Sequence, residues 1–167
     1  PSLVGSEMCI RDRYKIEPHI VTMAKGMGNG FPIGGILVHP SIEAQYGMLG
    51  TTFGGNHLAC AASVAVLDVL EEEKLQSRAS ELEPYFVAQA KNIPEIKKIK
   101  GRGLMLGLEF DFEVGPLRKT LIYDEKIFTG GSSNKNLLRI LPPLTVQKKH
   151  IDYFFTSLKV ALKEHSN

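Results

Sequence analysis

The sequence predicts an α/β protein built from two parts that differ in their style of secondary structure. Short apolar runs at residues 20–24 and 33–38, rich in β-branched residues and followed or interrupted by glycines, predict strands in the first part. Helical patterns then fill residues 57–91, and after Pro94 short strands alternate with helices. We therefore expect one domain portion at 14–91 and a second, small α+β domain at 92–167.

Composition and charge exclude several classes of function. The 167 residues are 43% hydrophobic and 23% charged, as in ordinary globular domains. The net charge of +2 comes from interspersed acidic and basic residues, so neither nucleic acid nor a membrane is an expected partner. No apolar run approaches the roughly 20 residues that cross a bilayer. Cys9 and Cys60 are too few for a disulfide framework, so we expect a cytoplasmic protein without a metal site.

Residues 1–13 are interpreted as a leader of foreign origin. The segment SLVGSEMCIRDR at 2–13 resembles neither a secretory nor a transit signal. Back-translated from Leu3 in one reading frame, it matches a transposase adapter that is used to prepare DNA sequencing libraries. The fold prediction therefore starts at Tyr14, and the chain is expected to be the C-terminal fragment of a longer protein.

Lys25 is predicted to lie where the first strand becomes a loop. The run from Ile20, expected to be buried, ends at Lys25, and three glycines in the next five residues predict a tight turn. An amine at this position can be partly desolvated, which favours its neutral, nucleophilic form. Most lysines that follow strands are nevertheless plain surface residues, so the position alone is weak evidence.

Residues 50–56 predict a loop that leads into a long helix capped by Asn56. Thr51 and Thr52 precede a glycine pair and the positive end of that helix. Hydroxyl and backbone N–H groups in such a place can bind a phosphate, although an ordinary capping turn is the simpler interpretation. In the helix itself, we interpret His57 and Cys60 as part of a packed face, because no further metal ligand is near in sequence.

Both long helices are predicted from apolar residues that recur every three or four positions. The face of the first contains Ala59, Ala62, Val66, Val69 and Leu70, with Ser63 among them. The face of the second contains Leu75, Ala79, Leu82, Phe86 and Ala90. Pro84 is expected to kink the second helix or to mark its start.

The second part is predicted as a small sheet with two helices. Strands are expected at 96–99, 104–110 and 137–141, a Gly-Arg-Gly turn at 101–103, and helices at 117–125 and from about Val146. Ile151, Phe154, Phe155, Leu158 and Leu162 form the apolar face of the last helix. Arg139 shares one face of its strand with Leu137 and Leu141. A guanidinium there is either part of a structural ion pair or a bidentate anchor for an acidic substrate.

Five segments, in order along the chain, resemble the class III aminotransferases, which are fold-type I enzymes that use pyridoxal phosphate. They are EPHIVTMAKG at 17–26, GFPIGG at 30–35, GTTFGGNHLACAAS at 50–63, GRGLMLGLEF at 101–110 and LLRILPPLTV at 137–146. Within the family, the resemblance implies a homodimeric enzyme of arginine biosynthesis. Such an enzyme transfers an amino group between acetylornithine or succinylornithine and 2-oxoglutarate.

The resemblance also implies roles for four residues. Lys25 matches the lysine that holds the cofactor covalently and moves a proton at the substrate α-carbon. Thr52 matches the threonine that binds the cofactor phosphate of the opposite subunit, and Thr51 contacts substrate across the same interface. Arg139 matches the arginine that binds the substrate α-carboxylate.

Other functions remain open. The same segments suit class III enzymes acting on ornithine, 4-aminobutyrate or another ω-amine, and a non-catalytic interaction fragment is an alternative of a different class. One residue, His19, stands where the family usually has aspartate. The family's pyridine-pairing aspartate, stacking aromatic residue and phosphate loop would lie upstream of Tyr14, so the chain alone is expected to be inactive.

Overall fold

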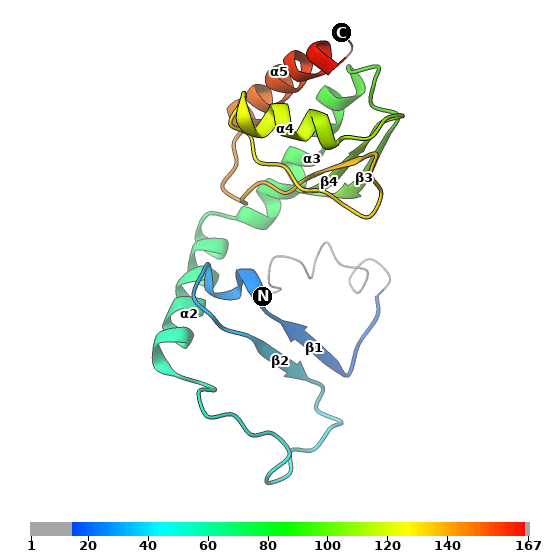
Figure 1. The fold of residues 1–167 in the computed structure, drawn as a ribbon. Coiled ribbons are helices and arrows are strands. Elements are labelled where there is room, and N and C mark those ends of the chain that lie inside the picture. Colours follow the sequence, from blue (N-terminus) through cyan, green and yellow to red (C-terminus); the bar gives the residue numbers. More distant parts are fainter. Residues whose placement is uncertain (1–14, 166–167) are drawn as a thin grey trace. The chain divides into compact units, whose positions relative to one another are not determined.

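The computed structural model describes residues 15–165, and the chain divides into two compact units between Lys74 and Leu75 (Figure 1). The sequence pattern predicts a domain boundary near Asn92, which is after the helix at 75–91 and not before it. The division by contacts falls before the helix at 75–91 because that helix packs against elements of the second unit. Each unit is described by itself, and the adapter-like leader falls outside the described residues.

The first unit contains a two-stranded antiparallel sheet and a long helix. Strand β1 (Ile20–Met23) pairs with β2 (Gly35–Val38), and the short 3-10 helix η1 (Lys25–Gly28) follows β1. Both predicted strands are present, but the expected burial of β1 is wrong, because its residues alternate between exposed and partly exposed. A sheet of two strands offers few neighbours to cover it.

The long helix of this unit, α2 (His57–Glu72), begins as the sequence predicts. The side-chain oxygen of Asn56 accepts a hydrogen bond from the Ala59 amide at 2.9 Å, which satisfies one of the free N–H groups of the first turn. Ala59 and Ser63 are buried, while Val69 of the predicted face is exposed. The helix contacts η1.

The interpretation of His57 and Cys60 as a packed face is wrong, since both are exposed. By helical spacing, these two residues are rotated away from the buried pair Ala59 and Ser63. Among residues 15–165 there is also no cluster of three or more side chains suited to hold a metal ion.

Three helices belong to the described part of the second unit, and the apolar faces predicted for two of them are confirmed. The three helices are α3 (Leu75–Lys91), α4 (Gly115–Tyr123) and α5 (Lys148–His165). Every residue predicted for the faces of α3 and α5 is buried. The rings of Phe86 and Phe155 lie 4.7 Å apart where these two helices pack. Pro84 lies inside α3, so it does not mark the start of that helix.

The three strands of this unit form an antiparallel sheet in the order β3-β4-β5, with β3 at Lys98–Arg102, β4 at Met105–Glu109 and β5 at Leu137–Ile140. The buried pairs Leu106 with Ile140 and Leu108 with Leu138 form its core face. The turn between β3 and β4 comes slightly later than predicted, at 103–104.

Gly101 makes that hairpin possible. It has a φ of +98°, and a Cβ at this position would lie 1.9 Å from the carbonyl oxygen of Met105. Any other residue would therefore both strain the backbone and collide with the paired strand.

Candidate active site

Lys25 lies where the backbone changes direction abruptly. Ala24, with φ −160° and ψ −161°, is extended. Lys25 has a φ of 56°, in the left-handed region that residues other than glycine seldom adopt. A hydrogen bond from the Met27 amide to the Ala24 carbonyl, 3.3 Å long, closes the turn. Backbone strain of this kind is often found at functional sites.

The amine of Lys25 is free among the described residues. Within residues 15–165 it makes no hydrogen bond and no ion pair, and the residue is exposed. The expected desolvation of this amine by the preceding strand is therefore not supplied by the described part of the chain. A Cβ on the adjacent Gly26 would meet no atom within 4 Å, so among the described residues the backbone next to Lys25 is uncovered.

The loop at 50–56 presents two exposed threonines at the N-terminal end of α2. A Cβ at Gly54 would come within 2.1 Å of Thr51 Cγ2, so this glycine lets the loop fold closely over Thr51. The Asn56 side-chain amide donates to the Phe53 carbonyl at 3.0 Å, which ties the loop to the helix start. Hydroxyls near the positive end of a helix suit an anion such as a phosphate.

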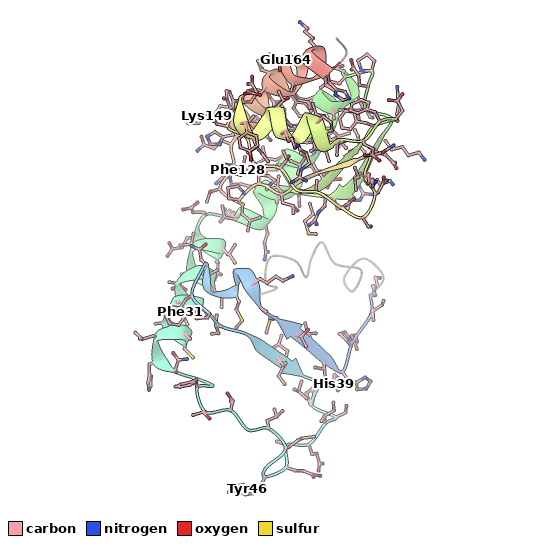
Figure 2. All side chains as sticks on the ribbon, in the orientation of Figure 1. Phe31, His39, Tyr46, Phe128, Lys149 and Glu164 are labelled. Carbon is pink, nitrogen blue, oxygen red and sulfur yellow. The ribbon has the colours of Figure 1, made fainter. Side chains whose placement is uncertain are left out.

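The structure does not bring this loop to Lys25 within the first unit. Figure 1 shows η1 beside the body of α2, while the loop before α2 lies away from it at the helix start. Tyr46, in the segment between β2 and α2, projects from the same end and is fully exposed (Figure 2). Lys25 and the threonine pair of one chain thus occupy separate places.

Arg139 lies on the opposite face of β5 from Leu138 and Ile140, as the predicted alternation requires, and this face is turned away from the core. Leu138 and Ile140 are buried, whereas Arg139 is exposed. The sheet register places Gly107 of β4 on one side of Arg139, and an isolated bridge places Gly130 on the other. Both neighbours lack side chains, so the surroundings of the guanidinium stay open.

No ion pair involves Arg139 among residues 15–165. Its Nη1 donates to the Gly131 carbonyl at 3.3 Å, which leaves further donors for a ligand. The two alternatives left open by the sequence were a structural ion pair and an anchor for an acidic substrate. The described residues provide no carboxylate for the first.

Glu109 lies on the same face of the sheet but is occupied by other partners. Lys100 contacts its carboxylate at 3.0 Å, and the side chain of Asn134 donates to it at 2.9 Å. The hydrogen bond from Lys100 lowers the pKa of Glu109 below its ordinary value, and the bond from Asn134 acts in the same direction, against the opposing effect of burial. Glu109 is thus held as a carboxylate without neutralising Arg139.

Sequence reasoning missed three residues around Arg139, namely Gly107, Gly130 and Arg118. Gly107 belongs to a segment recognised in the sequence, and Gly130 belongs to a conspicuous glycine pair, but neither could be assigned a partner from the sequence. Arg118 lies in α4 and donates to the Thr129 carbonyl at 3.0 Å, next to that glycine pair. Strand pairing and helix docking, which bring the four together, carry no local sequence signal.

Comparisons with known proteins agree on one family. The model of the family described as aminotransferase class-III matches residues 6–162. The acetylornithine aminotransferase of Methanocaldococcus jannaschii is 38% identical over 92% of this chain and 39% of its own length. Ornithine aminotransferase 2 of Staphylococcus aureus is 37% identical over 89% of this chain and 38% of its own length.

A solved structure gives the same result for the fold. A phospholyase from Arthrobacter, in complex with phosphoethanolamine, superimposes with a TM-score of 0.83 at 31% identity, covering 96% of this chain and 42% of that one. The chain therefore spans about two fifths of the length of the proteins that it matches. Within residues 15–165, no helix has the length and apolarity to span a membrane.

Proposed function

From the premise that this chain belongs to the class-III aminotransferase family, we propose that it is the Lys25-bearing part of an acetylornithine or succinylornithine aminotransferase of arginine biosynthesis. Membership in this family implies a fold-type I enzyme with pyridoxal phosphate as cofactor. In the complete enzyme, residues 14–91 would belong to the large domain and its connecting helices, and 92–167 to the small C-terminal domain. The cytoplasm remains our expected location for it.

The observation that carries the proposal is the free amine of Lys25 at a strained turn. The residue follows directly after β1, and among the described residues the backbone next to it at Gly26 is uncovered. Within residues 15–165, no carboxylate pairs with its ammonium group. An amine in this setting is available to a carbonyl group, which suits the lysine that holds the cofactor.

The chemistry divides among the four residues. Pyridoxal phosphate, when bound, supplies an aldehyde that condenses with amines and a ring that withdraws electrons from the substrate carbon bearing the reacting amine. Lys25 Nζ holds the cofactor and then takes and returns a proton at that carbon. Arg139 binds the substrate α-carboxylate with its planar donor fork. In 2-oxoglutarate this group is bonded directly to the reacting carbon, so the contact orients that carbon.

Thr52 would act in the site of a second subunit. Its loop lies away from η1 in Figure 1, which supports a role for Thr52 outside the site of its own Lys25. A homodimer in which Thr52 binds the cofactor phosphate of the partner, and Thr51 contacts substrate there, accounts for this placement. The positive end of α2 would add to the binding of the phosphate.

Ornithine is the second candidate donor, and a specific observation favours it. Ornithine aminotransferase 2 of Staphylococcus aureus is nearly as similar to this chain as the acetylornithine enzyme of Methanocaldococcus jannaschii, at 37% and 38% identity. The described residues around Arg139 suit the carboxylate that both donors share. The acyl group would be recognised elsewhere.

The test of this proposal uses a complete protein, in which residues 15–167 follow the upstream segment of the Methanocaldococcus jannaschii relative. Incubation with pyridoxal phosphate, borohydride reduction and peptide mapping should place the label on Lys25. The Lys25→Ala variant should lose the label and at least about a thousandfold of transaminase activity. Assays with acetylornithine, succinylornithine, ornithine, 4-aminobutyrate and phosphoethanolamine then rank the donors.

Lys74 provides a matched control. It is also an exposed lysine with a left-handed backbone, at φ 50°, and it belongs to the same unit. Lys74→Ala should keep both label and activity. Selective labelling of Lys74, or full activity in Lys25→Ala, would overturn the assignment of Lys25 and favour a non-catalytic interaction fragment.

A further inference from the structure

We propose that Arg118 is a positioning residue that holds the guanidinium of Arg139 in place through residues 129–131. The inference rests on the proposed function, because it takes Arg139 as the group that binds the substrate carboxylate. Arg118 lies on α4 and Arg139 on β5, and residues 129–131 run between them along the outer edge of that strand.

The first contact joins Arg118 to the segment. Arg118 Nη2 donates a hydrogen bond to the Thr129 carbonyl at 3.0 Å. A Cβ on Gly131 would lie 2.9 Å from Arg118 Nη1, so the guanidinium rests directly against the glycine backbone. Arg118 therefore fixes both ends of the segment, one by a hydrogen bond and the other by close packing.

The second set of contacts joins the segment to Arg139. Gly130 and Arg139 exchange two backbone hydrogen bonds, of 2.8 Å and 2.9 Å. Arg139 Nη1 donates to the Gly131 carbonyl at 3.3 Å. A Cβ on Gly130 would lie 3.1 Å from Arg139 Cβ, which shows how closely the two backbones approach. The position of the Gly131 carbonyl thus sets the direction of the Arg139 guanidinium.

The charges around this segment argue for a role beyond stability. Among residues 15–165, neither Arg118 nor Arg139 takes part in an ion pair, although both guanidinium groups contact the same three-residue segment. Arg118 Nε and Thr129 Oγ1 are buried and have no protein partner in the described residues. Arg118 as a whole is partly buried, and a partly buried cation with an unsatisfied donor is a costly way to pack a helix against a loop.

The consequence is a preset anchor. Without Arg118, the Thr129 and Gly131 carbonyls would be held only by the bridge at Gly130, and the Arg139 side chain would sample more rotamers. Binding a carboxylate would then require ordering of that side chain, which weakens affinity. Two parallel hydrogen bonds from the guanidinium to a carboxylate require a fixed orientation of the Arg139 side chain. A simple attraction between opposite charges requires it less.

The kinetic test uses the complete protein described above, with 2-oxoglutarate as the varied substrate. Arg118→Ala should raise the KM for 2-oxoglutarate about tenfold, with a much smaller change in kcat, as expected for one lost charged hydrogen bond. Arg118→Lys should recover part of the loss, because it restores a single donor. Lys119→Ala, which removes an exposed cation from the neighbouring position of α4, should leave KM unchanged.

A second variant tests the same contact without removing a charge. Gly131→Ala introduces a methyl group that collides with the Arg118 guanidinium, so it should raise KM in the same direction. If Arg118 acts through Arg139, adding Arg118→Ala to Arg139→Ala should raise KM no further. Independent, additive effects of the two substitutions would overturn the positioning role.

The outcomes separate this inference from the proposed function. If Arg139→Ala leaves KM unchanged, the proposed role of Arg139 fails. If Arg139→Ala raises KM about a hundredfold while Arg118→Ala and Gly131→Ala have no effect, only the inference about Arg118 fails.

A measurement on the 167-residue chain itself needs no catalytic activity. Arg118→Ala should speed amide hydrogen exchange at Gly130 and Arg139 about tenfold, while Lys119→Ala should not. Unchanged exchange at both amides in Arg118→Ala would overturn the inference, whatever the activity of the complete protein.

Discussion

The two units of this chain bury their side chains to very different extents. In residues 75–165, the helices and the sheet enclose a core of fully buried leucines and phenylalanines. In residues 15–74, Ala59 is the buried hydrophobic residue, while Leu37, Phe53 and Leu58 are more than half exposed. The second unit therefore has the core of a small domain, whereas the first leaves most of its large apolar side chains exposed.

The two halves of the proposed site differ in the same way. Lys25 and the threonine pair belong to the open unit, where the described residues give the lysine amine no partner. Arg139 belongs to the packed unit, where its strand, two flanking glycines and Arg118 already form its surroundings. We infer that the carboxylate anchor is preformed in this chain, whereas the cofactor end of the site needs more protein.

The largest expected effect is on autonomous folding. Residues 75–167 produced alone should show a cooperative thermal transition by circular dichroism, because the buried core lies within them. Residues 15–74 produced alone should show none, since a two-stranded sheet and one helix bury too little surface. Cooperative melting of 15–74 would contradict the comparison.

A matched pair of leucine substitutions tests the difference at single residues. Leu158 is 0% exposed in α5, and Leu37 is 57% exposed in β2. In the whole chain, Leu158→Ala should lower the free energy of unfolding by about 2–5 kcal/mol, through lost burial and a cavity. Leu37→Ala should change it by less than about 0.5 kcal/mol. Urea unfolding with equal m-values for the two variants provides the measurement.

The cap of α2 should have an intermediate effect, confined to the first unit. Asn56→Ala removes the acceptor for the Ala59 amide and should cost about 1 kcal/mol of local helix stability. The Ala59 amide should then exchange its hydrogen faster with solvent. Asn56→Ser keeps a capping oxygen, so its exchange rate at that amide should stay close to that of the wild type. Equal exchange in wild type and Asn56→Ala would show that the cap does not stabilise the helix start.

The smallest effect should be the acid response of the second unit. Because the pKa of Glu109 is lowered in the folded state, its contribution to stability is present above the unfolded pKa, near 4.5, and is lost as pH falls through the folded pKa. At pH values below 4.5, the urea concentration at the unfolding midpoint of residues 75–167 should therefore decrease slightly. Both Lys100→Ala and Glu109→Gln should weaken that pH dependence. If the urea midpoint varies with pH in both variants as it does in the wild type, Glu109 does not cause the acid response.

Much of the fold could be predicted because its signals are local. The apolar faces of α3 and α5 follow from helical periodicity, since residues three or four apart lie on the same side of a helix whatever surrounds it. The Asn56 cap and the alternation around Arg139 are equally local. The aminotransferase family was recognised from five short segments, and the family model confirms it.

What only the tertiary structure decided depends on contacts distant in sequence. Strand register places Gly107 and Gly130 on either side of Arg139, and helix docking brings Arg118 to the same segment. The exposure of β1 and Lys25 depends equally on which neighbours are present. The amino-acid pattern specifies which face of an element is apolar, whereas the partner of that face is set by packing across the whole chain.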